Sequence, residues 1–182
     1  LGLATDGSAN GVTVLKQGWG VEPLTEGQAA CVSTMSYNEY WVVRDAGYTP
    51  EQLTVFKYQA EGASTLEDGL YVLEKNLGDD SFKDKMVRFV RASMKGWKYA
   101  EANPKEAASI ILDNDDAGVQ TEKHQIRMMG EIAKLTAGSN GSLDPSDYER
   151  TVKVLMSGAS DPVITKEPSG AWTHDITNAA LN

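Results

Sequence analysis

The sequence predicts an α/β fold whose second half is almost entirely helical. Between residues 12 and 58, short segments rich in β-branched and aromatic residues alternate with short helical patterns, which is the order of a parallel sheet with crossover helices. From Ser81 onward, apolar residues recur at helical spacing and capping residues mark successive helix starts. A doubly wound sheet normally needs about five strands, and three lie close together here, so the predicted sheet is incomplete.

Four segments have the composition of strands, because β-branched and aromatic residues dominate them. They are residues 12–19, 31–35, 53–58 and 69–74. Short helical patterns lie between the first three. One has Pro23 near its start, a second runs from 38 to 46 and ends before Gly47, and the third is a turn that begins at Pro50.

Four longer helices are predicted after residue 80. Ser81 with Asp84 resembles a capping box for a helix that continues to about 102, and Asn103-Pro104 opens the next one, which runs to 112. Thr121 and Asp144-Pro145 mark the starts of two more. Their apolar residues have core spacing, so we interpret them as packing residues.

Composition and charge exclude several classes of partner. The chain has 182 residues and a formal net charge of -9, which would be repelled by nucleic acid and by an anionic membrane surface. No apolar run approaches the roughly 20 residues of a membrane span, and the N-terminus has no signal-like core. The single Cys31 allows no internal disulfide and, inside an apolar run, is expected to be a buried small hydrophobe.

The sequence predicts no metal site and no cofactor. Residues 113–118, DNDDAG, resemble the start of a calcium loop, but Ala117 and His124 stand where the pattern needs oxygen ligands. The two histidines, His124 and His174, have no cysteine or carboxylate at zinc-ligand spacing. Phosphate-binding glycine loops and the nucleophile elbow of hydrolases are also missing from the sequence.

The strongest candidate site is SYNEYW, residues 36–41, directly after the predicted strand 31–35. Ligands of open α/β sheets bind beyond the carboxyl ends of strands, and here those positions also form the first turn of a helix. Ser36, Tyr37, Asn38 and Glu39 could stack on a flat polar ligand and hydrogen-bond it. The alternative is structural: Asn38 caps the helix and Glu39 complements its dipole. The residues alone favour neither.

Two stretches, Tyr37-Asn38-Glu39 and a helical pattern between Arg91 and Ala108, carry a resemblance to the thiamine-pyrimidine-type solute-binding proteins of bacterial ABC importers. Members typically show Tyr-Asn-Glu after a strand, matched here by residues 37–39. They also share a helix pattern that is matched here by Arg91-Ala92, Lys95-Gly96, Tyr99-Ala100, Asn103-Pro104 and Glu106-Ala107-Ala108. The resemblance covers almost the whole chain.

The resemblance implies a two-lobed, type II periplasmic-binding-protein-like fold that closes on a small ligand in the cleft between its lobes and docks on a membrane ABC permease. Residues 1–68 would be the remainder of the second lobe, and residues 69–182 the returning helical part of the first. It also implies that an N-terminal part, or a second chain, supplies the rest. Localisation would be periplasmic, or extracellular with a lipid anchor.

The same resemblance implies the site and its ligand. Ser36, Tyr37, Asn38 and Glu39 would face the cleft, and Glu61 and Gly62 would lie at the crossing between lobes. A thiamine pyrimidine precursor is the favoured solute. Two alternatives remain: an enzyme like the eukaryotic thiamine-pyrimidine synthases, whose cysteine-rich motif this sequence lacks, and a structural α/β module without a ligand.

Overall fold

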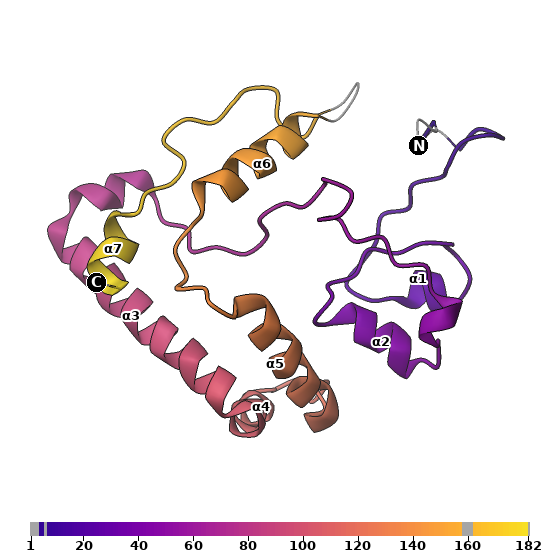
Figure 1. Ribbon diagram of the computed structural model, residues 1–182, viewed down its shortest axis with the longest axis horizontal. Helices are drawn as coiled ribbons and strands as arrows, with labels where there is room; N and C mark the ends of the chain where they lie inside the picture. The colour runs from indigo at the N-terminus through magenta and orange to yellow at the C-terminus, as the bar shows by residue number, and fades with distance from the viewer. Residues whose placement is uncertain (1–3, 6, 158–161, 182) are drawn as a thin grey trace. The chain divides into compact units, whose positions relative to one another are not determined.

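The structure is a computed structural model that describes residues 4–5, 7–157 and 162–181. Its regular elements are helices (Figure 1). They are α1 (Glu22–Thr25), α2 (Glu39–Asp45), α3 (Asp80–Ala102), α4 (Pro104–Asp113), α5 (Glu122–Thr136), α6 (Pro145–Met156) and α7 (Asp175–Leu181), with the 3-10 turns η1 (Pro50–Gln52) and η2 (Glu74–Gly78).

The chain divides into two compact units, each built from two stretches of sequence. The first unit comprises residues 1–54 and 108–132, and the second comprises residues 55–107 and 133–182. The lobes that the resemblance implies, 1–68 and 69–182, stay a prediction.

The predicted strands are wrong for the described part of the chain. Residues 12–19, 31–35, 53–58 and 69–74 contain no strand, and Thr13 forms only an isolated bridge. Composition favours a strand, but a strand exists only where a neighbour pairs with its backbone and covers its side chains. Here the apolar side chains are largely open to solvent, as Val14 at 70%, Phe56 at 65% and Tyr71 at 82% exposure show.

The longer helices form where the sequence predicts them, because their start signals are local. Thr121 receives the His124 N–H at the start of α5, and the Asp144 carboxylate accepts the Ser146 N–H at the start of α6. One detail differs at α3. Its cap is Asp79, whose carboxylate accepts from the N–H groups of Ser81 and Phe82, so the predicted Ser81 cap lies inside the first turn of the helix.

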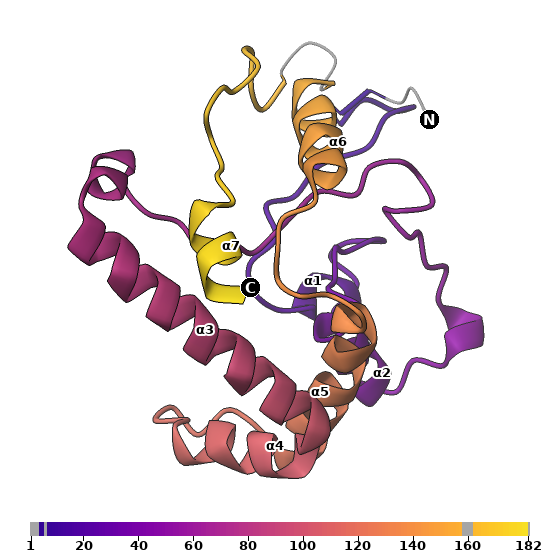
Figure 2. The ribbon, with the colours of Figure 1, turned by 60° about the vertical axis from the view of Figure 1, so that its left-hand side comes forward.

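The short helix α7, which the sequence pattern did not predict, packs against α3 in the second unit. Figures 1 and 2 both show it lying beside α3. The Arg91 guanidinium donates to the carbonyl oxygens of Ala179 and Ala180 at 3.1 and 3.2 Å. A cation placed on the last carbonyls of a helix satisfies acceptors that have no partner within the helix. Arg91 therefore fixes the end of α7.

The described core is small. The exposed surface is 13560 Å², whereas about 8600 Å² is expected for one compact domain of this mass and about 10300 Å² for two separate domains of the size of these units. Large side chains such as Trp19, Phe89 and Leu135 are exposed. Cys31 is exposed too, which corrects the expectation that it is buried. The buried apolar residues are Val21, Val43, Val90, Ala107, Ala108, Met129, Val152 and Ala180.

No helix in the described ranges is long and apolar enough to cross a membrane.

Candidate functional site

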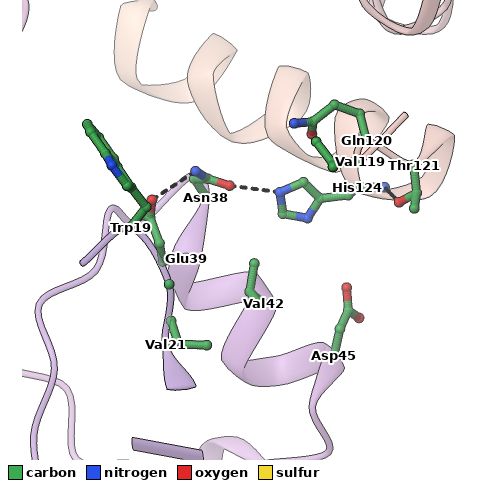
Figure 3. Close-up of a pocket in the computed structure, with 11 residues that line it drawn as sticks. Trp19, Val21, Asn38, Glu39, Val42, Asp45, Val119, Gln120, Thr121 and His124 are labelled. Atoms are coloured by element: carbon green, nitrogen blue, oxygen red, sulfur yellow. Dashed lines mark hydrogen bonds between the residues drawn. The ribbon is translucent and has the colours of Figure 1, made fainter. Parts of the chain in front are cut away.

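An open pocket of about 350 Å³ lies within the first unit, between α2 and the start of α5 (Figure 3). Carboxylates, amides and an imidazole line it together with apolar side chains. The lining residues are Trp19, Gly20, Val21, Asn38, Glu39, Val42, Asp45, Val119, Gln120, Thr121 and His124.

The turn before α2 places Asn38 and Glu39 at the pocket. Residues 36–38 form a tight turn in which the Asn38 N–H donates to the Met35 carbonyl at 3.2 Å. Asn38 then occupies the N-cap position of α2 but makes no side-chain cap hydrogen bond. The structural alternative from the sequence, in which the Asn38 side chain caps the helix, is therefore not what the structure has. Its amide is used elsewhere.

The Asn38 amide links Glu39 to His124 in a chain of hydrogen bonds. Asn38 Nδ2 donates to Glu39 Oε1 at 2.9 Å, and Asn38 Oδ1 lies 2.8 Å from His124 Nε2 (Figure 3). Because a carboxylate only accepts, the amide nitrogen must face Glu39 and the amide oxygen must face the imidazole. His124 Nε2 is therefore the donor in this hydrogen bond.

Glu39 also secures the turn that carries it. Its second oxygen, Oε2, accepts the Met35 N–H at 2.9 Å, so the carboxylate reaches back to the backbone as the glutamate of a capping box does. An ionised carboxylate has about four acceptor positions, and these two bonds use two of them. The carboxylate thus has a structural bond and still has capacity to accept from a ligand in the pocket.

Asp45, at the other end of α2, joins the helix to α5 through two cations. Its oxygens lie 2.9 Å from Arg127 NH1 and 3.1 Å from Lys123 Nζ. The hydrogen bond from Arg127, followed by that from Lys123, holds the pKa of Asp45 below its ordinary value of 3.8. The two cations offset the Asp45 charge. Among the described residues no cation pairs with Glu39, so its charge remains for a ligand.

The start of α5 is held by a second set of polar bonds. Asp115 accepts the Gln120 N–H at 2.7 Å, and Gln120 Oε1 accepts from the buried Gln125 amide at 2.6 Å. The acidic loop 113–118 therefore stabilises the start of α5 through the Asp115 carboxylate. No group of three histidine, cysteine or carboxylate side chains that could hold a metal ion occurs in the described part of the chain.

Of the predicted site residues, Asn38 and Glu39 line the pocket and the other four do not. Ser36 lies exposed in the preceding turn, and Tyr37 is half-buried beside it. Glu61 and Gly62 belong to the second unit.

Gly62 ends a single helical turn in the second unit. Ala63 N–H donates to the Tyr58 carbonyl at 2.9 Å, Gly62 N–H donates to the Gln59 carbonyl at 3.4 Å, and Gly62 has a φ of 71°. These two bonds and the left-handed residue make a Schellman motif. The left-handed backbone conformation at this position therefore favours glycine.

Sequence reasoning missed the residues that α5 brings to the pocket, above all His124. Asn38 and His124 are 86 positions apart, and no local pattern connects them. In the sequence, His124 stands out only as a candidate metal ligand.

A smaller hollow of about 150 Å³ lies in the second unit, between α3 and the end of α5. Trp97 and Met94 contribute its apolar wall, and Thr136 donates to Glu101 at its edge at 2.5 Å. It holds no pair of groups comparable with Asn38 and Glu39.

A comparison with known protein families identifies the family of the chain. The family described as NMT1/THI5 like matches residues 3–107, which is more than half of the sequence. The chain belongs to this family. Membership agrees with the resemblance to thiamine-pyrimidine-type binding proteins and implies a periplasmic-binding-protein-like fold. The described residues are rich in helix. No curated protein and no solved structure matches the chain.

Some of the pocket residues lie inside the sequence stretch that matches the family, and others lie beyond it. Trp19, Asn38, Glu39 and Asp45 lie inside the matched stretch, whereas Gln120 and His124 lie beyond its end. A role related to solutes or to the thiamine pyrimidine follows from the NMT1/THI5 like family, and small-molecule binding is the coarse function that the family supports.

Proposed function

We propose that the chain is part of the solute-binding protein of an ABC importer and that its pocket holds a small heteroaromatic solute, with a thiamine pyrimidine precursor as the favoured ligand. The observation that carries this proposal is the pair formed by Asn38 and Glu39 at the pocket wall, 2.9 Å apart. The pair offers a hydrogen-bond donor next to an acceptor. An aminopyrimidine offers the complement, a ring nitrogen that accepts and an amino group that donates.

The chemistry of the pair suits a ligand that must be released again. Asn38 Nδ2 has a second hydrogen to donate, and Glu39 keeps open acceptor positions. Hydrogen bonds to an ionised carboxylate contribute about 1.5–3 kcal/mol each, enough to select a ligand without making its binding irreversible. Trp19 lies at the pocket edge with 99% of its surface exposed, so its indole is available to stack on a flat ring.

We propose transport binding in preference to catalysis. The synthase branch of the family depends on a cysteine-rich motif, and this sequence has one cysteine, Cys31. The pocket has an imidazole, but His124 donates Nε2–H to an amide. A synthase of that kind consumes pyridoxal phosphate, so incubation with pyridoxal phosphate and mass analysis of the products tests this choice. We expect no turnover.

Two segments with exposed apolar side chains support the proposal that an additional polypeptide segment packs against this chain. Residues 53–58 and 69–74 expose Phe56, Tyr58, Leu70 and Tyr71 by more than half. We propose that an additional part of the protein, the remainder of a two-lobed fold, pairs with these segments, and that the assembled periplasmic or lipid-anchored protein docks on a membrane permease.

Ligand binding is tested on the intact natural protein that carries this chain. Mass spectrometry of small molecules released from the purified protein identifies the bound solute. Calorimetric titration with hydroxymethylpyrimidine then measures its affinity. A pyrimidine among the released molecules, together with saturable binding, is expected. Release of a solute that lacks the acceptor-donor edge, with no heat from the pyrimidine, contradicts the proposed ligand class.

A further inference from the structure

The sequence contains the dipeptide Asn-Gly twice, at Asn10-Gly11 and at Asn140-Gly141. An asparagine that precedes glycine is chemically reactive, because the backbone nitrogen of glycine can approach the asparagine side chain without hindrance from a Cβ. Both asparagines are exposed to solvent. The two dipeptides therefore share the same local chemistry, and the structure around each one determines how readily it reacts.

Asn140 lies in the loop between α5 and α6, where a backbone donor polarises its side-chain amide. The Ser142 N–H donates to Asn140 Oδ1 at 3.0 Å. Because a backbone N–H only donates, the amide oxygen must face it. Negative charge develops on this oxygen when a nucleophile adds to Cγ, and a donor that is already in place stabilises that charge. The Asn140 amide carbon is thereby prepared for attack.

The nucleophile next to Asn140 is the backbone nitrogen of Gly141, and little holds it back. Its N–H donates to the hydroxyl oxygen of Ser139 at 3.1 Å. A side-chain hydroxyl leaves this bond by rotation about χ1, so no backbone turn has to open. Gly141 is itself exposed and has a φ of 79°, and glycine changes its backbone conformation without a side-chain clash. The Gly141 nitrogen can therefore be released for attack.

The backbone around Asn10 holds the corresponding groups in a turn. The Gly11 N–H donates to the Ser8 carbonyl at 2.9 Å, which is a backbone–backbone bond. The next N–H along the chain, that of Val12, donates to the Ala4 carbonyl at 2.8 Å. Attack by the Gly11 nitrogen requires this turn to open first. Asn10 is therefore protected by the structure, although its dipeptide is the same.

We propose that Asn140 is a site of spontaneous modification, at which the folded protein deamidates faster than at Asn10. The Gly141 nitrogen loses its proton to water or hydroxide and bonds to Asn140 Cγ, and the amide nitrogen Nδ2 takes up a proton and leaves as ammonia. The product is a five-membered succinimide ring. Water then opens the ring at either of its carbonyl groups and gives aspartate or isoaspartate. Water is the only co-reactant, and the proposal is independent of the ligand.

Deamidation at Asn140 would change the wall of the smaller hollow in the second unit. Gly141 lines this hollow together with Met94 and Glu101. Either product adds a carboxylate immediately before Gly141, and isoaspartate also lengthens the backbone by one carbon. The loop that faces α3 across the hollow therefore gains a negative charge of the same sign as Glu101.

The difference between the two sites follows from the backbone bond that must break at Asn10. Such a bond reduces the reactive fraction by about 2- to 12-fold, and this is the factor by which we expect Asn140 to react faster in the folded protein. In the unfolded chain neither site keeps its hydrogen bonds, so the difference should disappear.

The experiment follows both sites in the same protein. The intact natural protein is incubated in a mildly alkaline buffer, once folded and once unfolded in urea, and peptide mapping by mass spectrometry measures the fraction of each asparagine whose –NH2 has become –OH. Asn10 is the internal control, because it has the same dipeptide and is also exposed. Asn140→Gln is the matched variant, since the same amide on a longer side chain cannot form the five-membered ring. Released ammonia is measured for this variant and the wild type.

We expect Asn140 to deamidate about 2- to 12-fold faster than Asn10 in the folded protein, and the two rates to agree within about twofold in urea. Asn140→Gln should remove the faster phase of ammonia release. Equal rates in the folded protein, or a faster reaction at Asn10, would overturn the proposal. It is also overturned if the preference for Asn140 persists unchanged in urea, because the neighbouring sequence and not the fold would then cause it, or if Asn140→Gln keeps the faster phase.

Discussion

The guanidinium of Arg127 lies over the indole of Trp41, 4.8 Å from the ring centroid, while its NH1 lies 2.9 Å from Asp45 Oδ2. One side chain of α5 thus makes a cation–π contact and an ion pair with α2. The two helices that form the pocket are held together by this arrangement, because Arg127 is only 22% exposed and is shielded from water.

Removing Arg127 should therefore destabilise the first unit. For Arg127→Ala we expect a loss of about 1–2 kcal/mol in the free energy of unfolding, the sum expected for a partly shielded cation–π contact and an ion pair. Lys123→Ala is the control, since Lys123 contacts the same carboxylate but is 73% exposed, and it should cost less than about 0.5 kcal/mol. Urea unfolding followed by tryptophan fluorescence measures both. If both variants lose the same free energy of unfolding, the contact between Arg127 and Trp41 contributes nothing to stability.

Asp45 should make the free energy of unfolding depend on pH only under acidic conditions. Its folded pKa lies below 3.8, so the folded state binds the proton less readily than the unfolded state. The stabilising contribution is fully present above pH 3.8 and is lost as the pH falls through the lower folded pKa. Because the Asp45 side chain is 38% exposed, we expect at most about 1 kcal/mol.

Comparison of the wild type with Asp45→Asn checks this dependence. The stability difference between the two proteins should be constant from neutral pH down to about one unit above the ordinary aspartate pKa and should shrink below it. A difference that persists unchanged at lower pH would show that the substitution removes packing or hydrogen bonds and that the charge of Asp45 contributes nothing.

Gly62 should resist substitution for a backbone reason. Its φ of 71° lies in the left-handed region, which costs a side-chain-bearing residue about 1–2 kcal/mol and a β-branched residue the most. No neighbouring atom would meet an added Cβ, so strain is the only penalty. We expect Gly62→Val to lower stability by about this amount and Gly62→Asn to cost less, because asparagine tolerates this region.

If Gly62 lies at the crossing between lobes, as the resemblance implies, its backbone freedom would also serve to absorb lobe closure. Small-angle scattering of the intact natural protein with and without ligand tests that role in Gly62→Val. A variant that compacts on ligand addition as the wild type does would limit Gly62 to its turn.

The exposed apolar segments should make the isolated chain associate. Val14, Phe56, Tyr71 and Leu73 are each more than half exposed, and monomeric proteins rarely leave such surface open. We expect the isolated 182-residue chain to aggregate or to form dimers in analytical ultracentrifugation, and to gain solubility when the covering part of the protein is supplied. A monomeric chain that unfolds cooperatively and binds a pyrimidine alone would overturn the proposed partner.

The four longer helices were predictable from the sequence and the strands were not, for one physical reason. The bonds at Thr121 and Asp144 join residues two or three positions apart, so a short stretch of sequence contains them. The residues 53–58 have equally strong strand composition, but their hydrogen bonds must come from a neighbouring segment that composition does not reveal. The same physical difference therefore explains why the longer helices were predicted correctly and the strands were not.

The site was predictable to the same extent. Asn38 and Glu39 follow each other in sequence and were recognisable as a polar pair at the end of an apolar segment. His124 was not, because its bond to Asn38 spans 86 positions. The roles of Ser36, Tyr37, Glu61 and Gly62 in ligand binding stay predictions, since none of them lines the pocket.

The most direct test of ligand binding at this pocket is calorimetric titration of the intact natural protein and its Glu39→Gln variant with hydroxymethylpyrimidine. Glutamine keeps the shape of Glu39, but its one side-chain oxygen can accept from Met35 N–H or from Asn38 Nδ2 and not from both, and it loses the charge that an amino group on the ligand would meet. We expect the wild type to bind and Glu39→Gln to bind more weakly by about 1–3 kcal/mol. Equal affinity of the two proteins would remove Glu39 from the site, and with it the proposed mode of recognition.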